Sequence, residues 1–318
     1  MSNGIAQRQV ETDNVQKLAA QRYLYSKAKR VMVFQLILSV LVIILISIIN
    51  LCLKNQSFMS IFGKQPIDIA WLVATSGILI TILDLLCLSP VIENIKEKAA
   101  KIQELFDCDV LSLPWNEIIV GKRPDLEDVI DNTNKYSATR KDLGYRSLLN
   151  WYPKEVDKFP LGIARIVCQR SNMRWDGELR KNISFHLVMI AVIMFGVLLI
   201  IGFIGELSLK TFFEAIALCL PIWVFSIRQI HQNKKAIESL ERMKQQVGRA
   251  WDQAIKSSIS SAKLNEIARQ LQDSLFLNRK TNPLIFDFIY KRYRSTQESS
   301  MGYSCKNMID EYERIGQK

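Results

Sequence analysis

Residues 31–53 read VMVFQLILSVLVIILISIINLCL, a run without a single charged side chain. At about 1.5 Å of rise per residue, a helix of this run is about 34 Å long, enough to cross a hydrocarbon core of about 30 Å. A secretory signal peptide has a shorter apolar region, of about 7–15 residues, closer to the N-terminus. The run therefore predicts a membrane-spanning helix.

Three further apolar segments follow at residues 67–89, 183–205 and 211–230. The last is the least apolar, because it contains an acidic residue, a proline and an arginine. It begins only five residues after the third segment, so a hairpin through the bilayer accounts for both. The sequence predicts an all-α membrane protein with four transmembrane helices, arranged as two hairpins.

Basic residues mark the cytoplasmic side of membrane spans. All of the 42 Lys and Arg residues except Lys54, Lys64 and Lys210 lie in residues 1–30, 91–182 or 228–318. We therefore expect both termini and the long middle segment to be cytoplasmic. The formal net charge of +11 fits this bias and an attraction to anionic lipid headgroups, so no DNA or RNA polymer is expected as a partner.

The polar parts are predicted to form a mainly helical cytosolic domain from segment 91–182 and the C-terminal region 231–318, behind the basic N-terminal segment 1–30. Apolar residues at helical spacing predict a helix over 91–106 and another restarting near Leu161. Residues 107–130 are punctuated by Pro114, Gly121 and Pro124, and residues 132–160 are predicted to be irregular.

One continuous helix is predicted over residues 232–277, where an apolar stripe includes Leu240, Val247, Leu264 and Leu271. This helix could pack on the helix of residues 91–106 or associate with a second copy. A lysine in the seam makes the heptad pattern imperfect, so packing within the chain is favoured.

Enzyme signatures are absent from the sequence: there is no GxGxxG, GxxxxGK[ST], HExxH or GxSxG. The two histidines, His186 and His231, lie at predicted membrane boundaries. The six cysteines form no CxxC pair, so neither a disulfide nor a zinc site is expected. We expect no enzyme activity, no metal and no cofactor.

Charged residues inside spans are costly unless they are paired or hydrated. Asp84 could pair with Arg228 or line a water-filled path. Asp68 and Glu214, both near the outer face, could form an acidic ring in an oligomer or lie in the interface. Pro221 could act as a gating hinge or produce only a packing kink. These five residues are the pore and gating candidates.

The segment ARIVCQRSNMRWDGELRK, residues 164–181, contains arginines and a tryptophan just before the third span. Arginine forks and an aromatic face suit the phosphates and base of a nucleotide, but the same residues suit lipid headgroups. The candidate ligand residues are Arg165, Arg170, Arg174, Trp175, Arg180, Trp151 and Tyr152.

Four stretches resemble one family: LAAQRYLYSKAKR (18–30), FDCDVLSLPWNEIIVGKRPDLEDVI (106–130), NWYPKEVDKFPLGIARIVCQRSNMRWDGELR (150–180) and LQDSLFLNRKTNPLIFDFIY (271–290). In this order around four spans, they resemble the SMODS-associated four-transmembrane effectors of bacteria. The resemblance covers nearly the whole chain.

The resemblance implies a pore-forming effector of anti-phage defence in the bacterial inner membrane. A cyclic oligonucleotide, made by a cognate nucleotidyltransferase, would activate it to permeabilise the membrane and cause abortive infection, as a homo-oligomer. No ligand residues carry over from the family. Two alternatives stay open: a non-pore membrane scaffold or sensor that recruits a partner, and a membrane-bound enzyme that acts on lipid.

Overall fold

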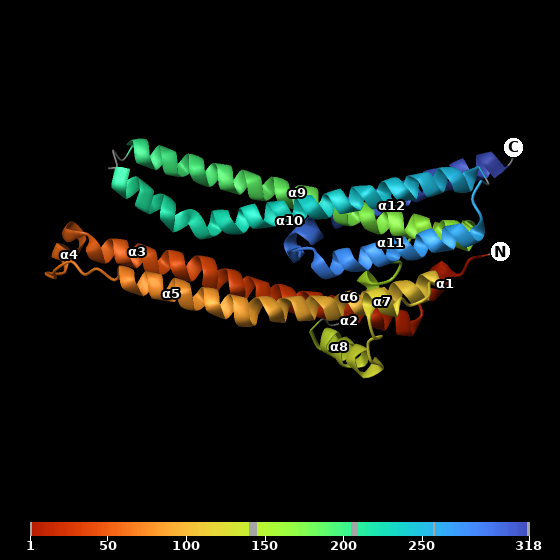
Figure 1. Ribbon diagram of the computed structural model, residues 1–318, viewed down its shortest axis with the longest axis horizontal. Coiled ribbons are helices and arrows are strands. Elements are labelled where there is room, and N and C mark those ends of the chain that lie inside the picture. The colour runs from red at the N-terminus through yellow and green to blue at the C-terminus, as the bar shows by residue number, and fades with distance from the viewer. Residues whose placement is uncertain (1, 140–144, 205–208, 257, 317–318) are drawn as a thin grey trace. The chain divides into compact units, whose positions relative to one another are not determined.

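The computed structural model describes residues 2–139, 145–204, 209–256 and 258–316 (Figure 1). All regular elements among these residues are helical, which confirms the all-α class. The chain divides into two units. The polar unit comprises Met1–Lys27, Glu93–Ile183 and Asn233–Lys318, and the apolar unit comprises Ala28–Ile92 and Ser184–Gln232.

Among the described residues, three helices are long and apolar enough to cross a membrane: Thr12–Lys54, Ala70–Leu111 and Leu161–Ile204. The first consists of α2 (Thr12–Leu36), the π-helical turn η1 (Ile37–Val42) and α3 (Ile43–Lys54). The second consists of α5 (Ala70–Leu83), the π-helical turn η2 (Asp84–Leu88) and α6 (Ser89–Leu111). The third is α9 (Leu161–Ile204), which begins at the predicted restart, directly after Pro160.

The fourth predicted span, residues 211–230, lies in α10 (Leu209–Ile255). Within the described part of the chain, α10 is not among the helices that meet the same length and composition test. The side chains of Glu214 and Pro221 lie outside the described residues. The count of four spans therefore stays a prediction at this point.

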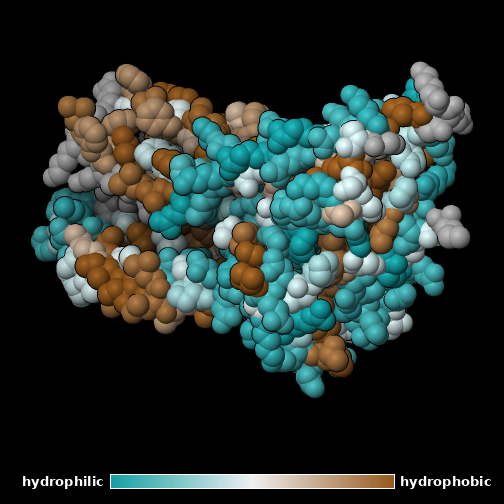
Figure 2. All heavy atoms as spheres, turned by 45° about the vertical axis from the view of Figure 1, so that its right-hand side comes forward, coloured by the Kyte–Doolittle hydropathy of each residue, from teal (hydrophilic) through white to brown (hydrophobic). Residues whose placement is uncertain are grey.

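Apolar side chains cover the surface of the apolar unit, as the brown areas of Figure 2 show. Leu45, Leu86 and Ile193 are 58%, 72% and 58% exposed. Side chains of this kind are normally buried in water-soluble folds, whereas lipid tails solvate them without cost. The apolar unit therefore has the surface of a membrane-embedded bundle.

Side-chain contacts join the helices of each hairpin of the apolar unit. In the first, which includes the short helix α4 (Gln56–Ile61), the backbone N–H of Ile69 donates to Asn50 Oδ1 at 2.8 Å. In the second, a Cβ on Gly202 of α9 would lie 2.9 Å from the Phe212 ring of α10. Gly202 is therefore a site of close helix approach, as its small size predicts.

The polar unit adds α1 (Ile5–Arg8), α7 (Glu117–Val120), α8 (Leu126–Thr139), the 3-10 turns η3 (Tyr145–Ser147) and η4 (Lys154–Lys158), α11 (Ser261–Thr281) and α12 (Asp287–Gly316). Its largest core cluster buries side chains from α6, α9, α10 and α11, among them Phe106, Val167, Val247 and Leu271. The apolar stripe of residues 232–277 therefore packs within the chain.

Two sequence-based predictions for this unit are wrong. The helix predicted over residues 232–277 is interrupted between α10 and α11, because Ser260 caps α11 and accepts a hydrogen bond from Lys263 N at 3.2 Å. Serine at an N-cap satisfies a backbone donor that the helix itself leaves free. The region predicted to be irregular from residue 132 begins inside α8, which buries Val129 and Tyr136.

Candidate functional site

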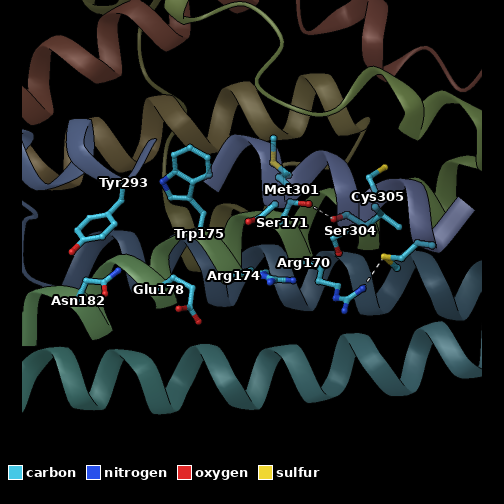
Figure 3. A pocket seen from close by; sticks show the side chains of 13 residues that line it. Arg170, Ser171, Arg174, Trp175, Glu178, Asn182, Tyr293, Met301, Ser304 and Cys305 are labelled. Atoms are coloured by element: carbon cyan, nitrogen blue, oxygen red, sulfur yellow. Dashed lines mark hydrogen bonds between the residues drawn. The ribbon is translucent and has the colours of Figure 1, made fainter. Parts of the chain in front are cut away.

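A cavity of about 200 Å³ lies between α9 and α12 in the polar unit (Figure 3). Helix α9 contributes Val167, Arg170, Ser171, Arg174, Trp175, Glu178 and Asn182. Helix α12 contributes Tyr293, Ser300, Met301, Ser304, Cys305 and Met308. Positions four residues apart share one face of a helix, which explains how the α9 residues reach one wall. Three predicted ligand residues, Arg170, Arg174 and Trp175, therefore meet here.

Arg170 lies half-buried in the cavity wall and pairs with no carboxylate of the residues that the structure describes. Its Nη1 donates to the sulfur of Met308, a weak acceptor. Glu311, whose charge also acts on Arg170, accepts a hydrogen bond from Trp251 Nε1 at 3.2 Å. Burial and the charge of Arg174 lower the pKa of the Arg170 guanidinium. An anion bound beside Arg170 would offset both the burial of its charge and the repulsion by Arg174.

Arg174 is exposed and adds a second positive charge one helical turn away. Within the described part of the chain, it forms no ion pair. Among the lining side chains that the structure describes, one carries a carboxylate, Glu178, which is paired with Lys181 at 3.2 Å. The described residues of the wall therefore carry a net positive charge.

Aromatic rings border the positive charges. Trp175 and Tyr293 line the cavity, and the Trp175 ring lies 5.9 Å from the Tyr290 ring of α12. The guanidinium of Arg22 lies 5.7 Å from the centre of the same Tyr290 ring. The π-face of an indole can stack on a nucleobase. The cavity thus combines the two features that recognise a nucleotide, cationic forks and aromatic faces.

The structure does not bring the other four predicted ligand residues to the cavity. Arg165 donates to Leu111 O at 2.6 Å and to Asn265 Oδ1 at 2.6 Å. Arg180 donates to Asp176 Oδ2 and Asn233 Oδ1, both at 2.9 Å. Acceptors inside the unit bind these guanidinium groups, and neither residue is among those described as lining the cavity.

Trp151 and Tyr152 belong to the core. The Trp151 ring packs edge-on against Phe106, with the ring centres 6.2 Å apart. Burial raises the pKa of Tyr152, so its hydroxyl stays protonated and donates to Asp107 Oδ1 at 2.7 Å. Neither ring is available to stack on a ligand in the cavity.

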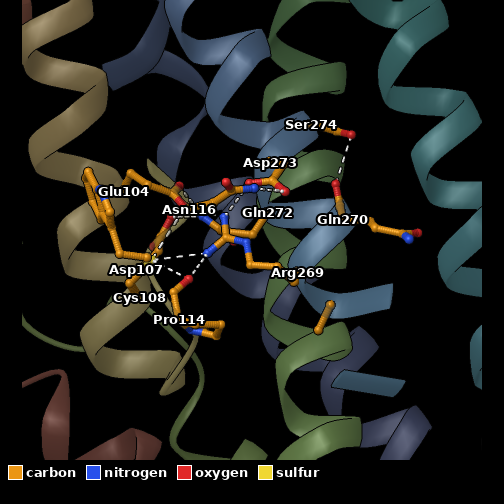
Figure 4. Close-up of polar contacts among 12 residues, drawn as sticks. Glu104, Asp107, Cys108, Pro114, Asn116, Arg269, Gln270, Gln272, Asp273 and Ser274 are labelled. Carbon is orange, nitrogen blue, oxygen red and sulfur yellow. Dashed lines mark hydrogen bonds and ion pairs between the residues drawn. The ribbon is translucent and has the colours of Figure 1, made fainter. Parts of the chain in front are cut away.

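A buried ionic cluster, which no pattern in the sequence predicted, joins α6 to α11 (Figure 4). The side chains of Glu104 and Asp107 are fully buried. Arg269 pairs with Glu104 at 2.6 Å, and Arg279 pairs with Asp107 at 2.5 Å. Gln272 donates to both carboxylates, at 2.8 and 2.9 Å. We call these five residues the ionic cluster.

The ionic cluster satisfies its own charges. Burial and the neighbouring charge of Asp107 raise the pKa of Glu104, while Arg269 opposes this shift. The carboxylates in turn raise the pKa of Arg269 and Arg279 against the effect of burial. Because each buried charge meets an opposite one at hydrogen-bond distance, the cluster has the character of a structural lock.

The candidate residues of the first hairpin have partners in their own chain. Asp84 lies at the start of the π-helical turn η2, accepts a hydrogen bond from Gln35 and accepts another from Ser89 at 3.0 Å. Its predicted ion pair with Arg228 is not formed among the described residues, and Arg228 is exposed. Asp68 pairs with Lys54 at 3.2 Å, an arrangement that suits an interfacial residue.

Residues 3–308 match the family described as the SMODS-associating 4TM effector domain. A protein of Bacillus cereus (strain VD146), described as a probable CBASS effector molecule, is 27% identical over 291 residues. The match covers 89% of this chain and 91% of that protein. No solved structure matches the chain.

Proposed function

Because this chain belongs to the SMODS-associating 4TM effector family, we propose that it is an anti-phage membrane effector that a cyclic oligonucleotide activates to permeabilise the membrane. One observation carries the assignment of a ligand site. The cavity holds two arginines without carboxylate partners among the described residues, beside Trp175 and Tyr293. A cyclic oligonucleotide has the phosphates and bases that these side chains bind.

The cavity is smaller than the roughly 300 to 1,000 Å³ typical of pockets for drug-sized ligands. It takes one nucleotide of a larger ring, and the rest of the ring extends from its mouth. A second copy of the chain could cover that exposed part. Ligand binding would then favour the homo-oligomer that a pore requires.

Coupling to the membrane follows from the length of single helices. Helix α9 runs from Leu161 to Ile204 and includes both the cavity wall and the third predicted span. A ligand must bind the open or oligomeric state more tightly than the closed one, since equal affinity would shift nothing. A rotation or shift of α9 at the cavity would then change the packing of the spans.

The proposed location is the bacterial inner membrane. Both termini are proposed to lie in the cytoplasm, where the messenger would be made. Four spans are proposed, the fourth being residues 211–230. Asp68, Asp84, Glu214, Pro221 and Arg228 stay candidates for pore or gating residues. The hydrogen bonds of Asp84 to Gln35 and Ser89 supply a polar contact that gating could rearrange.

Dye release from liposomes tests this proposal. The purified protein is inserted into liposomes and titrated with a panel of cyclic di- and trinucleotides. Release by one member with unchanged lipids supports a ligand-gated pore. Lipid turnover would favour the lipid-acting enzyme, and neither release nor turnover would favour the scaffold.

Two variants distinguish the effect of the cavity arginines from the effect of positive charge elsewhere on the surface. Replacing both Arg170 and Arg174 with Ala should abolish release and leave membrane insertion intact. Arg242→Ala, an exposed arginine of α10 outside the cavity, should behave as the unaltered protein. Undiminished release from the double variant would contradict the site.

A further inference from the structure

The cavity continues along α9 beyond the two arginines. Figure 3 shows Glu178, Asn182 and Tyr293 together toward one end and Arg170 toward the other. Glu178 lies about 6 Å along the helix from Arg174, at about 1.5 Å of rise per residue. Among the described residues the two ends differ in chemistry, because one holds the two guanidinium groups and the other offers a carboxylate, an amide and a phenol.

A carboxylate and an amide at one place select among nucleobases. Guanine presents two adjacent donors, N1–H and the N2 amino group, and an acceptor, O6. A carboxylate is acceptor-only when ionised, so it can take both donors, and an amide N–H can donate to O6. Adenine presents the N1 lone pair at the same place, and a carboxylate repels it. Cytosine and uracil have a smaller ring to stack.

We propose that this end of the cavity reads guanine, with Glu178 accepting from N1–H and N2–H and Asn182 donating to O6. Trp175 or Tyr293 supplies the face on which the base stacks. The proposal rests on the proposed function and deepens it: the activating messenger carries at least one guanine, whose adjoining phosphate lies on Arg170 and Arg174.

The surroundings of Glu178 permit the exchange of partners that this requires. Glu178 is paired with Lys181 at 3.2 Å, and Lys181 also lies 3.6 Å from Glu241. When guanine takes the Glu178 carboxylate, Lys181 retains Glu241. An exposed ion pair of this kind contributes little to stability, so its rearrangement opposes binding only weakly.

Calorimetry with the full chain in nanodiscs tests the proposal. The probes are cyclic di-GMP, cyclic GMP–AMP, cyclic di-AMP and cyclic di-UMP. We expect the two guanine-containing rings to bind at least about tenfold more tightly than cyclic di-AMP, the discrimination typical of a bidentate base contact. Cyclic di-UMP should bind no better than cyclic di-AMP.

Two variants make the test specific. Glu178→Gln keeps the shape but offers a donor in place of one acceptor, so the preference for guanine should fall to within about threefold. Glu241→Gln removes the other carboxylate near Lys181 and the same charge, yet lies outside the cavity, so the preference should persist.

The outcomes distinguish this inference from the function on which it rests. Equal or tighter binding of cyclic di-AMP, or an unchanged preference in Glu178→Gln, would overturn the guanine assignment alone. Dye release triggered by adenine or uracil rings would then still support a ligand-gated effector. Absence of binding by every probe and by the wider panel would overturn both.

Discussion

Arg269 and Arg279 of the ionic cluster lie against buried carboxylates, whereas Arg170 and Arg174 of the cavity lie beside aromatic, hydroxyl and sulfur-bearing side chains. All four belong to the polar unit. Burial of a guanidinium is costly unless an anion accompanies it. In the cluster the chain supplies that anion itself, whereas no carboxylate among the described residues pairs with Arg170 or Arg174.

The difference separates two uses of the same side chain. A paired arginine holds α6 against α11, and buried carboxylates of the same unit already balance its charge. An arginine whose partner is a methionine sulfur keeps its fork available for an external phosphate. Perturbed charges in a concave site indicate function more often than those in a closed network. The following experiments test that distinction.

Breaking the ionic cluster should have the largest effect. Glu104→Ala removes the fully buried carboxylate that pairs with Arg269 and leaves this arginine only Asp273, at 2.9 Å, so we expect the free energy of unfolding to fall by about 3 kcal/mol. Urea unfolding in nanodiscs, followed by tryptophan fluorescence, measures this. The control is Asp131→Ala, which removes an exposed partner of Lys135 and should cost less than about 1 kcal/mol. Equal losses of unfolding free energy in the two variants would show that the ionic cluster stabilises the fold no more than an exposed ion pair does.

Removing the cavity arginines should affect binding rather than folding. The double variant Arg170→Ala and Arg174→Ala loses two charge-assisted contacts, so we expect about 100-fold weaker binding of the cyclic nucleotide that triggers release. Unfolding by urea should be unchanged, because neither arginine has a carboxylate partner among the described residues. A loss of stability as large as that of Glu104→Ala would show that Arg170 and Arg174 stabilise the fold, as the ionic cluster does.

Introducing a carboxylate beside Arg170 should give this arginine an ion-pair partner within the chain. Met308→Glu places an acid where the Met308 sulfur now accepts from Arg170. The new ion pair competes with the phosphate, so binding should weaken about tenfold relative to Met308→Gln, which has the same size without the charge. Equal affinities of the two variants would show that Arg170 does not bind the phosphate.

The smallest effect concerns the thiol in the cavity wall. Burial, with Glu155 nearby, raises the pKa of Cys305 from 9.0 to about 11. Between these values the unfolded chain releases a proton that the folded chain retains, so this contribution to stability is present below pH 9 and is lost as the pH rises toward 11. Cys305→Ala should flatten the fall in urea stability over this range.

Ser304→Ala is the control for that measurement, because it alters the same wall without removing a titrating group. The comparison between variants is needed because the lysines also titrate in this range. A slope that is unchanged by Cys305→Ala would mean that the thiol ionises equally in both states.

Part of the candidate site was predictable from residue types. Arg170, Arg174 and Trp175 were expected to bind a ligand and do line the cavity, but the same reasoning also selected Arg165 and Arg180. Arg165 precedes Arg170 by five residues and therefore lies about 140° around the helix. Which face of α9 meets α12 depends on packing, so the sequence alone could not separate these arginines.

The ionic cluster illustrates the same limit over a longer distance. Glu104 and Arg269 are 165 positions apart in the chain. Each looks in the sequence like an ordinary charge on an amphipathic helix. Only the packing of α6 against α11 removes both from water and makes their pairing necessary.

What the sequence by itself determined is the class of the protein and its long helices. Hydropathy over 20 or so residues and the placement of basic residues are local properties, and the bilayer acts on them segment by segment. Tertiary structure decided which charges are paired, where the C-terminal helices break and turn, and which side chains surround the cavity. Those features depend on contacts between distant segments, whose energies no local pattern records.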